Sequence, residues 1–181
     1  MGPIKRIGHV NFRVADQERS KKFYTEVLGM EVAEEDPVHG GVFMTFGDDF
    51  HNVDVSDGRG GFARAPRPPG LVHVAFIVDS MKALREAYVQ LLEFGIEIDH
   101  ATNHANQRSI YFKDPDGNGM EIYYEIPDAK RLFWGGRGDT EDSLEVSKLG
   151  EPLPEWLLED DWPRPEVLEA MLAARRVGAQ S

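Results

Sequence analysis

The feature that most constrains the fold of this chain is an internal repeat. The stretch HVNFRVAD at residues 9–16 returns as HVAFIVD at residues 73–79. Each copy is followed by apolar residues at helical spacing and then by a second predicted strand, VLGMEV (27–32) in the first copy and EFGIEI (93–98) in the second. A self-similar period of this length indicates two copies of one supersecondary unit.

Each copy predicts the element order βαβββ. We expect the helices to begin with Asp16 and Asp79 as N-caps and to end at Gly29 and Gly95. After the strand that follows each helix, two further strands are predicted per copy, at 41–47 and 51–56 and at 108–112 and 120–126. The last two are joined by the turn sequence KDPDGNG, and the segment HATNHANQ before them is expected to be a polar loop.

The chain therefore divides into a repeat domain and an extension. The domain covers residues 4–126, with modules 4–57 and 70–126 joined by a Gly/Pro/Arg linker at 58–69. Residues 127–181 form a C-terminal extension that carries all three tryptophans (Trp134, Trp156 and Trp162) and an amphipathic helix from Pro165 to about Arg176. Because large aromatic side chains are rarely left in water, we expect this extension to pack on the domain or on a second subunit.

Alternation along the repeated strands separates an apolar face from a polar one. Val10, Phe12 and Val14 share one face of the first strand, which places His9 on the other. The same reasoning places His73 and Glu121 on the face that the helices leave uncovered. The predicted fold class is thus α+β: two βαβββ modules forming a half-open, barrel-like cup, with these three side chains inside it.

Two histidines and one carboxylate on a concave surface are a ligand set for a divalent metal. The chain has no cysteine, so thiolate sites and disulfides are excluded. With open positions remaining, the set suits the 2-His-1-carboxylate arrangement of non-haem Fe(II). A lone strand histidine is more often structural, but two at equivalent repeat positions favour metal ligation.

Charge and hydropathy restrict the partners. The formal net charge of −12 disfavours nucleic acid, whose binding depends on Lys and Arg. No apolar run is long enough to cross a membrane, and the N-terminal sequence lacks the apolar region of a signal peptide. A cytoplasmic location is therefore expected.

With these residues placed, the chain resembles the vicinal oxygen chelate (glyoxalase/bleomycin resistance/dioxygenase) superfamily, and within it a single-domain type I extradiol ring-cleavage dioxygenase. The resemblance covers residues 4–126 and is carried best by SIYFKDPDGNGMEIYYE (109–125). Its DPDGN turn is common across the superfamily. The tyrosine ten positions before the glutamate, Tyr111 before Glu121, is more typical of the extradiol enzymes.

The resemblance implies an activity and a site. It implies ring opening of a catechol-type aromatic diol by O2, beside the two hydroxyls, to give a semialdehyde, as in the catabolism of aromatic hydrocarbons. Fe(II) is the implied cofactor and Mn(II) the alternative. The implied metal ligands are His9, His73 and Glu121; the implied catalytic residues are His51, His104 and Tyr111; the implied substrate and oxygen pocket includes Asn11 and Tyr123.

Several alternatives stay open. Plain alternation puts His51 on the face of Val53 and Val55, so only a bulge or a strand end would aim it at the metal. His100 is a substitute for His104. A glyoxalase- or epimerase-type isomerase would use a fourth ligand, for which Asp54 is the candidate, and a metal-free binding protein is the third reading. A homodimer or higher homo-oligomer is expected from the open edge of a small cup.

Overall fold

The fold is a single curled sheet with few helices. The computed structural model describes residues 2–27, 29–36, 40–47, 49–56, 69–113, 117–134, 141–164 and 168. Its strands are β1 (Arg6–Arg13), β2 (Glu31–Asp36), β3 (Gly41–Thr45), β4 (Val53–Ser56), β5 (Gly70–Val78), β6 (His100–Asn103), β7 (Gln107–Lys113), β8 (Gly119–Glu125) and β9 (Asp142–Leu144). Its helices are α1 (Gln17–Lys22), which continues into a π-helical turn (Phe23–Val27), α2 (Met81–Glu93), α3 (Ala129–Leu132) and a 3-10 turn (Glu155–Leu158).

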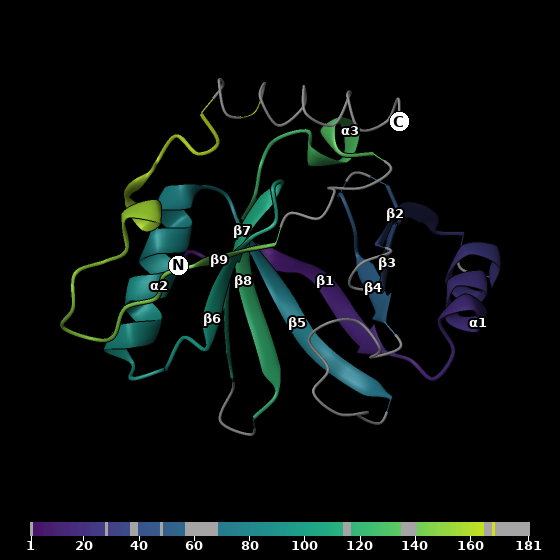
Figure 1. Ribbon diagram of the computed structural model, residues 1–181, viewed down its shortest axis with the longest axis horizontal. Helices are drawn as coiled ribbons and strands as arrows, with labels where there is room; N and C mark the ends of the chain where they lie inside the picture. The colour runs from purple at the N-terminus through teal and green to yellow at the C-terminus, as the bar shows by residue number, and fades with distance from the viewer. Residues whose placement is uncertain are drawn as a thin grey trace.

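The sheet order confirms the repeat. The nine strands run β2-β3-β4-β1-β5-β8-β7-β6-β9, so each module contributes four consecutive strands and β9 is added at one edge. β4 is parallel to β1, and β8 is parallel to β5 in the same way. β1 of the first module and β5 of the second lie side by side where the modules meet, and α1 and α2 lie at opposite ends of the molecule (Figure 1). This is the predicted α+β half-barrel, and its two modules pair within one chain.

The seam between the modules has local two-fold symmetry. β1 and β5 are antiparallel, and Val10 pairs with Val74, which is also its equivalent in the repeat. The axis relating the modules therefore passes between these two residues. His9 and His73 each lie one residue from it, opposite Ala75 and Asn11 respectively. Because they lie diagonally across adjacent strands on one face, their side chains are within reach of each other.

The helix ends follow the predicted signals with one correction. The Asp16 carboxylate accepts from the backbone N–H of Arg19 at the start of α1. In the second module the N-cap is Ser80, which accepts from Ala83 N–H, and not Asp79 as expected. Gly29 and Gly95 have φ values of +72° and +73°, the left-handed conformation that ends a helix at little cost in glycine.

One predicted strand is misplaced. Residues 93–98 were expected to form the strand after the second helix, but they form the end of α2 and irregular backbone. The strand begins later, with β6, in the segment predicted to be a polar loop. The difference arises because Ile96 N–H bonds back to Leu91 of the helix, and the ladder with β7 starts only where Asp99 N–H bonds to Tyr111 C=O.

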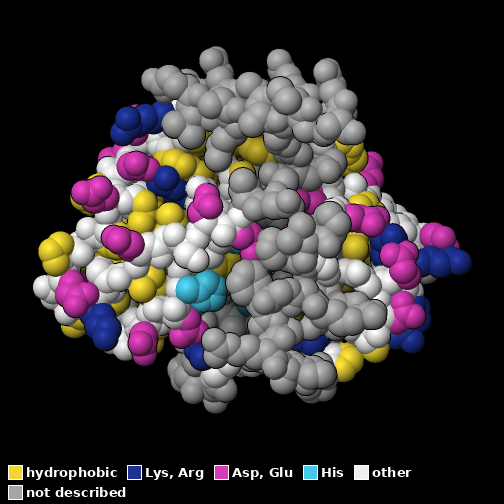
Figure 2. All heavy atoms as spheres, in the orientation of Figure 1, with side chains coloured by type: hydrophobic (Ala, Val, Ile, Leu, Met, Phe, Trp, Pro, Cys, Tyr) yellow, Lys and Arg dark blue, Asp and Glu magenta, His cyan; other side chains and the backbone are white. Residues whose placement is uncertain are grey.

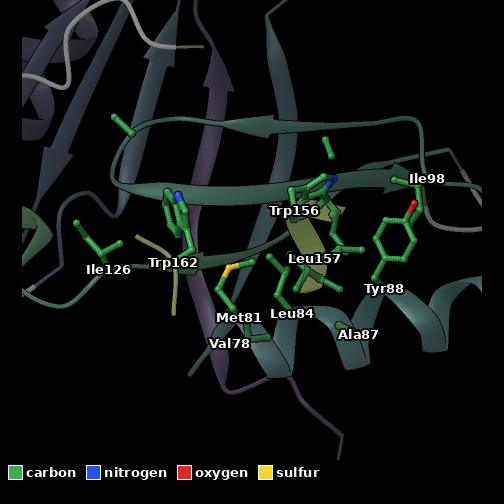
Figure 3. Packing of buried hydrophobic residues seen from close by; sticks show 14 of the residues in the cluster. Val78, Met81, Leu84, Ala87, Tyr88, Ile98, Ile126, Trp156, Leu157 and Trp162 are labelled. Carbon is green, nitrogen blue, oxygen red and sulfur yellow. The ribbon is translucent and has the colours of Figure 1, made fainter. Parts of the chain in front are cut away.

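The larger core lies between α2 and the second half of the sheet. α2 turns Met81, Leu84, Ala87, Tyr88 and Leu92 inward. Trp156, Leu157 and Trp162 of the extension join this cluster (Figure 3). The described part of the extension therefore packs on the domain, as one of the two expectations had it, although Trp134 is exposed and lies beneath the Lys130 ammonium at 5.3 Å.

Some sequence predictions fall on residues outside the described ranges. These include the linker at 58–68, the centre of the DPDGN turn and most of the amphipathic helix predicted from Pro165. On the face shown in Figure 2, Lys and Arg side chains lie dispersed among Asp and Glu. Among the described residues, the structure contains no helix with the length and hydropathy needed to span a membrane.

Candidate metal centre

The two seam histidines converge on one point. His9 Nε2 and His73 Nε2 are 3.1 Å apart, and His9 is almost fully buried. The orientation of the His9 side chain depends on the preceding residue, which has no partner in the register of β1 with β5. That residue is Gly8, and a Cβ there would lie 2.1 Å from the Tyr123 hydroxyl. Glycine thus permits the close approach that turns His9 into the cup.

Glu121 reaches the same point from β8. Its Oε2 atom is 3.0 Å from His9 Nε2 and 3.0 Å from His73 Nε2. Its other oxygen, Oε1, accepts from the Gln107 side-chain amide at 3.1 Å. Gln107 is itself buried and also donates to Ser109 Oγ. The carboxylate is therefore held with one oxygen facing the two histidines.

Electrostatics keep Glu121 ionised. Its burial alone would raise the pKa of the carboxyl group, but the charges and hydrogen bonds of His9 and His73 outweigh burial and hold that pKa well below its usual range. A buried carboxylate beside two imidazole rings is a stable anionic donor. Such a donor is suited to a cation.

Asp54 is the structural counterpart of Glu121 in the first module. Asn11 pairs with Asp54 across β1 and β4, and Ala75, the repeat equivalent of Asn11, pairs with Glu121 across β5 and β8. Asp54 Oδ2 is 3.6 Å from His9 Nε2. Ligand atoms of His9, His73 and Asp54 lie within 4.8 Å of one another. Two candidate ligand sets therefore share the histidines, and the Glu121 oxygen is the nearer carboxylate.

The donor set fits a divalent metal. Donors about 2.1 Å from one ion and at right angles to one another lie about 3 Å apart. The three distances among His9 Nε2, His73 Nε2 and Glu121 Oε2 are 3.0–3.1 Å. Two imidazole nitrogens and one carboxylate oxygen at these separations match one face of an octahedron, the arrangement typical of non-haem Fe(II).

His51 lies in the cup despite its unfavourable position in the alternation. It precedes β4, and Asn52 forms a bend between them, with its N–H donating to Met44 C=O. The alternation of β4 therefore does not extend back to His51. The ring is buried and lies 4.2 Å from the His9 ring, centroid to centroid. Its Nε2 is 3.5 Å from Asp54 Oδ1.

Tyr111 and His104 form a hydrogen-bonded pair. His104 Nε2 is 2.9 Å from the Tyr111 hydroxyl, and the Tyr111 and His73 rings form a T-shaped pair with centroids 5.8 Å apart. His100, the substitute considered for His104, instead stacks flat on the Tyr111 ring at 4.3 Å and is exposed. The structure thus separates the two histidines: His104 reaches the hydroxyl, and His100 supports the ring.

These side chains surround one cavity of about 140 Å³. Its described lining consists of His9, Asn11, Phe43, His51, Asp54, His73, His104, Gln107, Tyr111, Glu121 and Glu141. Seven of the eight predicted site residues are among them. The eighth, Tyr123, packs against the His9 ring at 5.3 Å, and its burial, with Glu125 and Glu121 nearby, raises its pKa.

The sequence reasoning did not identify Gln107 or Glu141. Gln107 shares the face of Tyr111 and Glu121 by alternation, so a closer reading of its strand would have found it. Glu141 lies in the extension, outside the repeat, and no pattern of the modules points to it.

Fold and site together define a duplicated βαβββ protein with a candidate metal centre between its halves. Residues 6–122 match the Glyoxalase/Bleomycin resistance protein/Dioxygenase superfamily, and the chain belongs to this superfamily. It is 29% identical over 144 residues to biphenyl-2,3-diol 1,2-dioxygenase 3 of Rhodococcus globerulus, covering 77% of this chain and 75% of that protein. It is 30% identical over 132 residues to catechol-2,3-dioxygenase of Bacillus subtilis, covering 67% and 42%.

A solved structure shows the same fold. Homoprotocatechuate 2,3-dioxygenase of Arthrobacter globiformis superimposes with a TM-score of 0.56 at 24% identity, over 69% of this chain and 38% of that one. The matched region covers less than half the length of the Bacillus and Arthrobacter proteins. The resemblance to this superfamily is thereby confirmed. The Rhodococcus and Bacillus relatives are named as dioxygenases of aromatic diols, whereas other matches are metallothiol transferases and a methylmalonyl-CoA epimerase.

Proposed function

We propose that the chain is an Fe(II)-dependent extradiol dioxygenase that opens the ring of a catechol-type aromatic diol with O2. The observation that carries the proposal is the facial set of His9 Nε2, His73 Nε2 and Glu121 Oε2, with separations of 3.0–3.1 Å. The names of the relatives from Rhodococcus and Bacillus support the reaction class. Mn(II) is the alternative metal.

His9, His73 and Glu121 would hold the ion. When bound, Fe(II) supplies the one-electron chemistry that dioxygen requires. Gln107 holds Oε1 of Glu121 and so fixes the direction of Oε2. A partner that orients a ligating carboxylate in this way typically changes metal affinity 10–100-fold when it is removed.

His51 is assigned as the acid/base. A diol must lose a proton to bind as an anion, and a product oxygen must gain one, and a histidine serves both steps near neutral pH. His51 lines the cavity, its ring lies beside that of His9, and it is 2% exposed. Its burial keeps bulk water from competing for the proton.

Tyr111, His104 and Asn11 are assigned to the reacting oxygens. The Tyr111 hydroxyl and the His104 ring nitrogen form a pair that lines the cavity, and Asn11 lines it from β1. Hydrogen-bonding groups held in place in this way orient the reacting oxygens without reorganising during the reaction. We assign Tyr123 a supporting role, since it contacts His9 from behind.

Addition of substituted catechols, biphenyl-2,3-diol among them, to Fe(II)-loaded protein tests the proposal, with and without oxygen. We expect oxygen uptake and a yellow ring-opened product under air, and neither under argon. Glu121→Gln should abolish both, whereas Glu97→Gln, an exposed glutamate of the same chain, should change neither. Absence of oxygen uptake across the panel would reject the dioxygenase.

Asp54 favours a second candidate, a metal-dependent isomerase with four protein ligands. Asp54 is buried and lies near both histidines. A fourth protein ligand would leave only two positions on a six-coordinate ion, enough to chelate a substrate but not to add O2. Turnover of a thiohemiacetal or an acyl thioester under argon by Ni(II)- or Zn(II)-loaded protein would establish this reading. The metal-free binding protein is disfavoured by the convergence of the three donors.

The domain division and the assembly are also proposals. We propose residues 4–126 as the catalytic domain and 127–181 as its extension, which the match of the superfamily to residues 6–122 supports. A homodimer or higher homo-oligomer in the cytoplasm stays a prediction, and light scattering after size-exclusion chromatography measures its mass.

A further inference from the structure

The extension adds a carboxylate to the cavity at a defined position. β9 pairs antiparallel with β6, with Leu144 opposite Ala101 and Asp142 opposite Asn103. Continued by one residue, this register places Glu141 opposite His104. The observed distance from Glu141 Oε1 to His104 Nδ1 is 3.6 Å, and both residues line the cavity.

Buried contacts fix this part of the extension. Just after β9, the indole N–H of Trp156 donates to Glu145 C=O at 2.8 Å, and Ser147 N–H donates to the Tyr88 hydroxyl at 2.7 Å. Trp156 and Tyr88 both belong to the main core. Glu141 therefore precedes a strand that is paired on one side and anchored behind, rather than a free terminus.

Three groups then form a chain from the cup to the extension. The Tyr111 hydroxyl is 2.9 Å from His104 Nε2, and His104 Nδ1 faces the Glu141 carboxylate. A neutral imidazole carries one proton, and a carboxylate beside one ring nitrogen favours the proton on that nitrogen. With the proton on Nδ1, the Nε2 lone pair is available to accept from the Tyr111 hydroxyl.

We propose that Glu141 is a positioning residue, which holds the proton of His104 on Nδ1 and thereby fixes the Tyr111 hydroxyl through His104. The extension thus completes the site that the two modules build. The consequence for catalysis rests on the proposed function, whereas the position of the proton does not. A strand added only to cover the edge of β6 would not need a carboxylate at this place.

Nuclear magnetic resonance of the full chain, loaded with Zn(II) and labelled with ring-15N histidine, tests the position of the proton. Spectra are recorded at about pH 8, above the ordinary histidine pKa of about 6.5. In the wild type we expect His104 Nδ1 to be protonated and Nε2 to show the shift of a bare nitrogen. Glu141→Ala should transfer population to the Nε2–H form. An unchanged spectrum, or an Nε2–H form already in the wild type, would overturn the proposal.

A double-mutant cycle tests the effect on Tyr111. With biphenyl-2,3-diol under air, Glu141→Ala should lower kcat about 10-fold, with a smaller change in KM, because an orienting partner is lost. In a His104→Gln background it should have no further effect. Equal losses in both backgrounds would contradict action through His104.

Asp142→Ala, a change at the exposed neighbouring carboxylate on β9, is the matched control and should leave the spectrum and kcat unchanged. Thermal unfolding shows whether each variant is folded. If the wild type consumes no oxygen, the proposed function fails, and the spectrum still decides the role of Glu141.

Discussion

The two modules have the same strand order but differ in the size of their hydrophobic cores and in the side chains that they contribute to the cavity. In the second module, the 13-residue helix α2 buries five side chains, whereas the six-residue α1 buries none. The first module has a small core of Met30, Val42, Met44 and Val55. The second shares its core with the extension. Duplication thus preserved the backbone frame and the paired histidines, while stability is concentrated in one half.

The side chains that line the cavity are divided more evenly between the two modules than the core is. The seam supplies one histidine from each module, but at the equivalent positions on β4 and β8 the first module has Asp54 and the second has Glu121. The first module adds His51, and the second adds Tyr111 with His104. The symmetric pair of histidines suits metal binding, and under the proposed function the unequal neighbours take distinct roles in proton transfer. The predictions that follow test this division.

The largest effect is expected from the symmetric pair. His9→Ala and His73→Ala should each abolish stoichiometric Fe(II) binding, and to the same degree, because each removes one of three converging donors. Metal content after dialysis and isothermal titration measure both. Retention of tight Fe(II) binding in either variant would contradict the equivalence of the two histidines as ligands.

The carboxylates should behave unequally. Glu121 Oε2 lies 3.0 Å from both histidine nitrogens, while Asp54 Oδ2 lies 3.6 Å from that of His9. Glu121→Gln should weaken metal binding by more than about 100-fold, and Asp54→Asn by about 10-fold or less. Competition with a chelator gives both affinities. Equal losses would favour the four-ligand isomerase over the dioxygenase.

Stability should follow the cores. Leu84→Ala in α2 removes a fully buried side chain and should lower the free energy of unfolding by about 2–5 kcal/mol. Ser20→Ala in α1, where no side chain is buried, should stay within about 0.5 kcal/mol. Urea unfolding measures both. A large cost at Ser20 would show that α1 contributes more than its burial indicates.

A smaller loss of stability is expected where the second module contacts the extension through Arg108. The Arg108 guanidinium lies 4.4 Å from the Trp162 ring centroid, donates to Trp156 C=O and pairs with Glu159 at 2.7 Å. Lysine lacks the planar group for stacking and for several directed hydrogen bonds. Arg108→Lys should cost about 1–3 kcal/mol.

The matched exchange for Arg108 is Arg131→Lys, at an arginine that is 73% exposed beside Asp128. It should cost less than about 0.5 kcal/mol, because exposed ion pairs contribute little. Urea unfolding compares the two. Equal costs would show that the tryptophans add nothing to the binding of the guanidinium.

The repeat explains why the fold and most of the site were predictable. His9, His73 and Glu121 follow from alternation, since a strand places every second side chain on one face. The strand at 93–98 was predicted wrongly because the backbone hydrogen bonds after α2 delay the ladder until β6, and apolar residues alone do not report this. The uncertainty about His51 came from extending the alternation of β4 through the bend at Asn52.

Glu141 illustrates a different limit. Its position depends on the pairing of β9 with β6, a contact between residues about 40 positions apart in a segment without repeat or motif. Local propensity does not specify such pairing, and only the folded sheet shows which side chain of the extension meets His104.

The seam of β1 and β5 has a consequence for how this molecule responds to its surroundings. Under the proposed function, an ion held by His9 from one module and by His73 and Glu121 from the other would link the two halves, and these three donors converge only in the folded chain. By mass action, free metal at about 100 times its dissociation constant adds about 2.7 kcal/mol to folding. The melting temperature should therefore rise with the logarithm of metal concentration, so that the thermal stability of the protein depends on how much free metal is present.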